Sequence, residues 1–338
     1  MNTTTNICSG IQKRKLTYLM IISVMLILVA GLTCLNLTIG EKNYSILEVL
    51  NMIISKSDNY IVMKLRLPRT LAAIFCGMAF GIAGNTFQTL LGNPLASPDI
   101  IGVSSGSTVA AVYCILFLNL NRGIVSLLAV IAGLVAALLI YKISNTDGYS
   151  ANRLILTGIG AQAFFTALIN WMIMKAAEYD VATAMRWMTG NLNGITVDSL
   201  PFLIIIVLIS LIIMSNLRNA LRSLELGEAY ATILGVRTDF IRTILIICSV
   251  CLIAFATAIS GPISSIAFLS GPIATRICGK SQTNLASSAL TGAILVLAGD
   301  FIGQNILPTR YPVGIITGIL GAPYLIYLLI SQNKGGTT

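Results

Sequence analysis

The stretch NLRNALRSLELGEAYATILGVRTDFIR, residues 216–242, is the longest strongly polar interruption in the second half of a chain built mostly from apolar runs. It carries four arginines, two glutamates and one aspartate, although only 10% of all residues in the protein are charged. Its apolar residues recur at helical spacing, which predicts short amphipathic helices with the charges facing away from the core. The predicted inward face contains Leu217, Leu221, Leu224, Ala231, Leu234 and Val236. Such a segment is either a solvated connector or a docking element.

Composition around this stretch indicates a membrane protein. The chain has 338 residues, of which 56% are hydrophobic, and its mean hydropathy is +0.89. A soluble domain would carry about 25% charged residues. Repeated apolar runs of about 20 residues are candidates for transmembrane helices, because a helix satisfies its own backbone hydrogen bonds in lipid. The sequence therefore predicts an all-α, polytopic membrane protein with a single transmembrane domain over residues 1–338.

The apolar runs predict ten spans. They cover residues 16–35, 67–90, 99–118, 124–141, 153–174, 200–216, 240–259, 261–277, 284–302 and 311–330. The eighth is expected to be short and broken, because Pro262 and Pro272 lie in it. Glycines at 77, 81 and 84, and at 314, 318 and 321, have the spacing of closely packed membrane helices.

Charge placement predicts the orientation. An even number of spans puts both termini on one side, and a small excess of lysine and arginine at that side makes it the cytosol. Residues 216–242 are then cytosolic, and the protein is expected in the cytoplasmic (inner) membrane. Lys64, Arg66 and Arg69 crowd an outer span end against the rule. They either reach lipid phosphates or form a site for an acidic partner or ligand.

The net charge of +9 is explained by basic residues at span ends, which contact lipid headgroups, and not by nucleic acid. The chain has no histidine, which removes histidine metal sites and Ser-His-Asp triads. A nucleotide-binding P-loop is excluded at Gly279-Lys280-Ser281, because Ala274 stands where the first glycine belongs. Asp300 lacks the GxGD pattern of intramembrane aspartyl proteases, because Leu297 replaces its first glycine. The span centres are almost free of ionisable residues, so energy is expected to enter from another subunit.

Six ordered motifs carry a resemblance to a known family. They are RLPR (66–69), NPLASPDIIGVSSG (93–106), RWMTGNLNG (186–194), LGEAYATILGV (226–236), GPI (261–263) and YPVGIITGILGAP (311–323). Together they resemble the FecCD-type permeases of ABC importers for iron-siderophores and vitamin B12. The resemblance implies a vitamin B12 permease-like fold with ten helices in one permease domain. It also implies a second permease subunit, identical or paralogous, two ATPase subunits that hold ATP and Mg²⁺, and an extracytoplasmic substrate-binding protein.

The resemblance also implies roles for individual residues. The segment 224–237 would couple the permease to the ATPase, through Leu226, Gly227, Glu228, Ala231, Leu234, Gly235 and Val236. Arg66 and Arg69 would dock the binding protein; the family's third arginine is Gln304 here, and Arg310 is expected to replace it. Ala151 and Asn152 would form an inner gate. The flanking arginines 218, 222, 237 and 242 are interpreted as headgroup anchors.

The resulting hypothesis is a permease subunit that imports an iron(III)-siderophore, binds no cofactor, metal or nucleic acid itself, and is not an enzyme. Cobalamin and haem remain alternatives, because this chain departs from many family members by lacking the span-8 histidine and by having Tyr311 before span 10. An ATP-independent carrier or channel, and an intramembrane enzyme using Asp300, are alternatives from other classes.

Overall fold

The computed structural model describes residues 2–55, 59–146, 150–279 and 283–335. Helices and the turns between them account for nearly all of these residues. The long and medium helices are α1 (Asn2–Thr38), α3 (Leu67–Leu91), α4 (Val103–Leu116), α5 (Arg122–Ser144), α6 (Ala151–Lys175), α8 (Leu200–Asn216), α11 (Thr238–Ser260), α12 (Ser264–Cys278), α13 (Leu285–Asn305) and α14 (Val313–Gly335). The shorter ones are α2 (Ile46–Ile54), η1 (Tyr60–Arg66), η2 (Pro98–Ile101), α7 (Glu178–Met188), η3 (Val197–Ser199), α9 (Arg218–Glu225) and α10 (Glu228–Ile233).

Each of the ten predicted spans falls on one helix of the first group. Among the described residues, seven helical segments are long and apolar enough to cross a membrane. The segments Val103–Leu116, Ser265–Cys278 and Val313–Leu328 are apolar but shorter. The all-helical, multi-span fold is therefore confirmed, and the exact number of ten spans stays a prediction.

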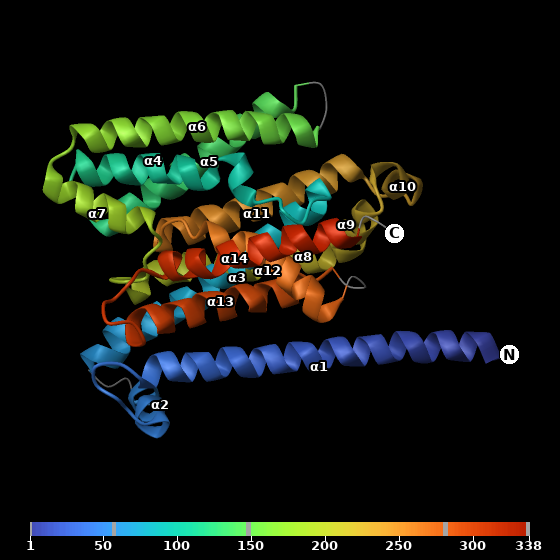
Figure 1. The fold of residues 1–338 in the computed structure, drawn as a ribbon, viewed down its shortest axis with the longest axis horizontal. Coiled ribbons are helices and arrows are strands. Elements are labelled where there is room, and N and C mark those ends of the chain that lie inside the picture. Colours follow the sequence, from blue (N-terminus) through green and yellow to red (C-terminus); the bar gives the residue numbers. More distant parts are fainter. Residues whose placement is uncertain (1, 56–58, 147–149, 280–282, 336–338) are drawn as a thin grey trace.

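Helix α3 is the centre of the bundle and packs against α11, α12 and α13 (Figure 1). Helices α4, α5 and α6 pack on one another beside this group, and α1 lies against α13 on the other flank. The start of α1, the end of α14 and α10 lie at one end of the bundle, which we call the α10 end. Helices α2 and α7 lie at the opposite end, the α2 end.

Small residues let α3 approach its neighbours closely, as the glycine spacing predicted. A Cβ atom at Gly81 or Gly84 would overlap the carbonyl oxygen of Ser288 or Ala267, on α13 and α12. Such backbone proximity gains dispersion contacts that lipid chains would otherwise supply. Gly318 differs, because it has open space where a Cβ would stand.

The eighth span is short, as predicted, and residues 261–263 around Pro262 are not helical. The predicted break at Pro272 is wrong, because α12 continues through it. Proline has no N–H, so the carbonyl of Phe268, four residues earlier, loses its helical partner. The Gln88 side chain donates to that carbonyl at 3.0 Å from Nε2 to oxygen. A polar side chain of α3 thus compensates the hydrogen bond that Pro272 cannot make.

Two predicted span starts also differ. The helix of span 2 begins seven residues before residue 67, as the π-helix η1. This π-helix precedes Pro68, which has no N–H and so cannot donate the backbone hydrogen bond of a regular α-helix. Span 3 was expected to start at residue 99, but Gly102 has a φ of 69°, and the α-helix begins at Val103. Left-handed backbone interrupts a helix and suits glycine.

Candidate functional site

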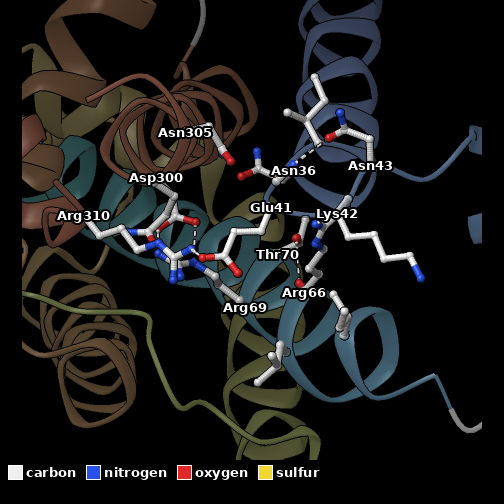
Figure 2. A pocket seen from close by; sticks show the side chains of 15 residues that line it. Asn36, Glu41, Lys42, Asn43, Arg66, Arg69, Thr70, Asp300, Asn305 and Arg310 are labelled. Atoms are coloured by element: carbon white, nitrogen blue, oxygen red, sulfur yellow. Dashed lines mark hydrogen bonds and ion pairs between the residues drawn. The ribbon is translucent and has the colours of Figure 1, made fainter. Parts of the chain in front are cut away.

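Two regions at opposite ends of the bundle contain most of the predicted site residues. At the α2 end, a cavity of about 590 Å³ lies between the end of α1, η1, the start of α3 and the end of α13. We call it the arginine cavity (Figure 2). It is lined by Asn36, Ile39, Gly40, Glu41, Lys42, Asn43, Ile61, Leu65, Arg66, Arg69, Thr70, Asp300, Gln304, Asn305 and Arg310. The three predicted docking arginines therefore lie around one cavity.

Arg66 caps the end of α1. Its Nη1 donates to the carbonyls of Leu37 at 2.9 Å and Thr38 at 3.0 Å, and its Nη2 donates to the carbonyl of Lys42 at 2.6 Å. The last carbonyls of a helix lack helical partners and carry partial negative charge, so a guanidinium is a favourable cap. Arg66 thus has a structural role beside any contact with a partner.

Arg69 forms a bidentate ion pair with Asp300. Its Nε and Nη2 lie 2.7 and 2.6 Å from the two carboxylate oxygens, and its Nη1 donates to the side chain of Asn193. The Asp300 side chain is only 3% exposed and that of Arg69 18%. The pair links the start of α3 to the end of α13, and planar two-bond geometry makes it a strong contact.

The pairing also bears on the intramembrane-enzyme alternative. That reading needs a second acid beside Asp300, and its neighbour is the guanidinium of Arg69 instead. Within the described ranges, no group of three or more histidine, cysteine, aspartate or glutamate side chains could hold a metal ion. The geometry at Asp300 is that of a structural ion pair.

Arg310 is the most accessible of the three arginines. Its side chain is 60% exposed and forms an ion pair with the exposed Glu41. An exposed pair of this kind contributes little to stability. Arg310 can therefore exchange Glu41 for an acidic group of a partner at small cost.

The second region is the polar stretch at residues 216–242, which folds as α9, a turn, α10 and a second turn. Gly227 begins the first turn with a φ of 103°, and Gly235 begins the second with a φ of 79°. The N–H groups of Gly235 and Val236 donate to the carbonyls of Thr232 and Ala231, the pattern of a Schellman cap. Both glycines are required by backbone conformations that L-residues rarely adopt.

The short helix α10 is anchored by one face and presents the other. Ala231 is fully buried, whereas Tyr230 and Leu234 are each 64% exposed and Ile233 is 80% exposed. Leu226, in the preceding turn, is also exposed. The prediction that Leu234 packs inward is therefore wrong. We call Leu226, Tyr230, Ile233 and Leu234 the α10 patch.

Arg242 holds this segment against the bundle. Its side chain is only 5% exposed, and its Nη2 lies 2.9 Å from the carboxylate of Glu228 on α10. It also contacts Asp239, with 3.3 Å between Nη1 and Oδ1. The interpretation of Arg242 as a headgroup anchor is wrong, because a buried, paired guanidinium cannot reach lipid headgroups.

The predicted gate residues, Ala151 and Asn152, are the first two residues of α6. Ser150 caps this helix by accepting the N–H of Arg153 at 3.5 Å. Ala151 is half-buried and Asn152 exposed. Residues 147–149, which precede them, lie outside the described ranges. The gate role stays a prediction.

A further cavity of about 400 Å³ opens between η2, α6, α12 and α14. Its walls combine small or weakly polar residues, among them Ser97, Gln162, Ser265 and Gly318, with the apolar Ile100, Phe268, Leu269 and Leu325. Asp99 also lines it, but its carboxylate accepts hydrogen bonds from Ser104 at 2.5 Å and Ser97 at 3.2 Å.

Sequence reasoning missed Asn193, Glu41 and the pairing of Asp300. Asn193 accepts hydrogen bonds from both Arg69 and Arg122, which ties the connector before α8 to α3 and α5. A usable signal existed for Asp300, because isolated opposite charges at the ends of two apolar spans require compensation. No spacing rule indicates Asn193 or Glu41.

The geometry can be compared with known proteins. The model of the FecCD transport family matches residues 14–331. The ferric enterobactin permease FepG of Escherichia coli is 36% identical over 82% of this chain and 85% of the relative. The Fe(3+)-citrate permease YfmE of Bacillus subtilis is 35% identical over 94% of this chain and 96% of the relative. The vitamin B12 permease BtuC of Salmonella newport is 31% identical over 96% of this chain and 98% of the relative. A metal-chelate type ABC transporter solved in an inward-facing conformation superposes with a TM-score of 0.81 at 25% identity, covering 93% of this chain and 99% of that one.

Proposed function

The chain belongs to the FecCD transport family and is a permease of the ABC importer type; from this premise we propose that it imports an iron(III)-siderophore. ATP would be hydrolysed on two separate ATPase subunits, and a substrate-binding protein would deliver the chelate. Relatives named for enterobactin, achromobactin, citrate and hydroxamate support an iron chelate. The vitamin B12 relative keeps cobalamin as a second candidate.

The observation that carries this proposal is the exposed α10 patch. Apolar side chains this exposed on a polar segment are costly in water unless a partner covers them. A short helix held rigidly by Arg242 and by two glycine turns is suited to a groove of an ATPase. Movement of that groove would then be passed to α9 and α11, which flank α10 in the chain.

Orientation follows from the same segment. Because the ATPase is cytosolic, the α10 end would face the cytosol and the α2 end the exterior. The start of α1 and the end of α14 lie at the α10 end, so both termini would be cytosolic. The arginine cavity would then face the binding protein.

The path for the chelate is proposed at the cavity beside Gly318. One copy lines the cavity with η2, α6, α12 and α14, and the open space at Gly318 leaves room for a second permease subunit beside α14. The pair would enclose the path, and alternating movement of the two copies would open it to either side. A second subunit could be identical or a paralogue, as the relatives FepD and FepG of one ferric enterobactin system illustrate.

Reconstituted transport tests the proposed function. The permease is incorporated into proteoliposomes with a candidate ATPase and a candidate binding protein, and uptake of ⁵⁵Fe is followed with catecholate, hydroxamate and citrate chelates. We expect uptake of at least one chelate that depends on ATP and on both partners. Uptake of cobalamin or haem instead would overturn the substrate, and uptake without the ATPase would make the chain a secondary carrier.

Docking of the binding protein is predicted to depend on Arg310. Arg310→Glu is expected to weaken binding about tenfold, because a like charge then faces acidic groups of the partner. Glu41→Gln is expected to strengthen binding, because it removes the carboxylate that competes for Arg310. Affinity is measured by surface plasmon resonance at low and high salt, since screening should reduce both effects.

The matched control is Arg186→Glu, the same charge change on α7, also at the α2 end but outside the arginine cavity. It should leave the affinity within about twofold, because Arg186 lies outside the cavity that is proposed to contact the partner. Equal losses for the two reversals would show a general field effect and refute a docking role for the cavity. Arg66 and Arg69 are proposed to contribute as well, but their structural bonds make single reversals there harder to interpret.

A further inference from the structure

A third cavity, separate from the arginine cavity and the proposed path, lies on the side of the bundle between α5, α8 and α11. It has a volume of about 530 Å³. Its lining is Arg122, Gly123, Ser126, Leu127, Val130, Gly194, Thr196, Asp198, Ser199, Phe202, Phe255, Ala258 and Ile259. The segments Arg122–Ser144, Val197–Asn216 and Thr238–Ser260 are each long and apolar enough to cross a membrane. The cavity lies between their ends at the α2 end, and the connector before α8 supplies part of its lining.

The lining is divided along its length. The part nearer the middle of the three helices is apolar and contains Leu127, Val130, Phe202 and Phe255. Leu127 and Phe202 are 60% and 69% exposed, so this part opens outward between α5 and α8. An opening of this kind at the depth of the hydrocarbon region can accept an acyl chain, whose dispersion contacts with the apolar lining would replace its contacts with other lipid chains.

The other part is charged and lies at the α2 end. Arg122 is the first residue of α5; its Nη2 donates to the carbonyl of Ile259 at 3.2 Å, and its Nη1 donates to the carbonyl of Asn193. These bonds fix the guanidinium and use two of its five N–H donors. Asp198, on the exposed turn before α8, puts a carboxylate on the same cavity.

We propose that this cavity binds one phospholipid whose headgroup carries both a phosphate and a primary amine, as in phosphatidylethanolamine. The phosphate would accept hydrogen bonds from Arg122, because guanidinium forms strong charge-assisted bonds with phosphate oxygens. The ammonium would donate to Asp198. One acyl chain would occupy the apolar part. A choline headgroup has no N–H to donate, and a glycerol headgroup has no positive charge, so the site should select ethanolamine.

Native mass spectrometry of the full-length permease in detergent tests the proposal by titration with three lipids of identical acyl chains. Phosphatidylethanolamine is expected to bind a first site about tenfold more tightly than phosphatidylcholine or phosphatidylglycerol, the effect of one charge-assisted hydrogen bond. Glycerophosphoethanolamine, which has the headgroup without acyl chains, should not compete. Equal binding of the three lipids, or full competition by the headgroup alone, would overturn the proposal.

Two variants locate the site. Asp198→Asn should remove the preference for ethanolamine over choline while leaving the Arg122 bonds intact. Val130→Trp should fill the apolar part and weaken the first site, because the indole occupies the space that the acyl chain needs. Leu138→Trp is the matched control, because Leu138 is exposed on the same helix but outside the cavity. An unchanged preference in Asp198→Asn, equal effects of the two tryptophans, or cross-linking of a second copy across the cavity would each refute the assignment.

Discussion

The double substitution Ile233→Asp and Leu234→Asp is expected to abolish ATP-driven uptake while the permease stays folded. Both side chains are more than 60% exposed in the free permease, so the change removes no internal packing. In a complex they would be buried, and full burial of such a side chain contributes about 1.5–3 kcal/mol. Losing two of them, and burying two carboxylates instead, should weaken association with the ATPase about a hundredfold or more.

The measurement is co-purification of the ATPase with the permease, together with uptake in proteoliposomes. Binding-protein affinity at the α2 end serves as the check that the variant is folded. Asn219→Asp, an acidic substitution on exposed α9 outside the patch, is the control and should keep both activities. Retained association in the double variant would show that the α10 patch is not the coupling surface.

Gly235→Arg tests the same segment through its backbone. The φ of 79° at this position costs an L-residue about 1–2 kcal/mol, and the strain falls on the Schellman cap that sets the direction of α10. No atom lies within 4 Å of a Cβ at this position, so the effect cannot come from a core clash. ATPase association and uptake should both fall, and intact coupling would refute the assigned role of residues 224–237.

Local sequence patterns predicted the helices well where one feature decided the structure. The apolar run at residues 200–216 coincides with α8, because Pro201 stands in its first turn, where proline is tolerated, and no glycine or charge lies inside the run. Helix α10 was less predictable. Its two residues Ala231 and Leu234 are three apart and were assigned one face, yet Leu234 points outward because the Schellman turn starts there. In a six-residue helix, the turn geometry decides orientation more than helical periodicity does.

Long-range contacts were the main omission. Arg69 and Asp300 are 231 positions apart, and no local rule relates them. The RLPR motif predicts a docking role for Arg69, and the sequence around Asp300 contains no partner for its carboxylate. The contact arises because α3 packs along α13 through glycine, which brings the start of one helix to the end of the other. The packing of α3 against α13, and not the local sequence around either residue, therefore determines the ion pair between Arg69 and Asp300.

Asp300→Ala is expected to be the most destabilising single substitution at the α2 end. It would leave the guanidinium of Arg69, which is only 18% exposed, without its bidentate partner. Breaking a buried pair in this way costs about 3–5 kcal/mol, because one charge stays desolvated and uncompensated. The apparent Tm of the purified permease should fall by roughly 5 °C or more, measured by thiol-reactive or intrinsic fluorescence during heating.

The double variant Arg69→Met and Asp300→Leu separates stability from docking. Replacing both members of a buried pair with apolar side chains of similar volume is often neutral or stabilising, so most of the lost Tm should return. If Arg69 also contacts the binding protein, this stable double variant should still bind it more weakly than the unmodified permease. Full stability with unchanged binding would assign Arg69 to the bundle alone and leave docking to Arg66 and Arg310. Failure of the double variant to recover stability would show instead that the bond from Arg69 to Asn193, and not the ion pair, holds this end together.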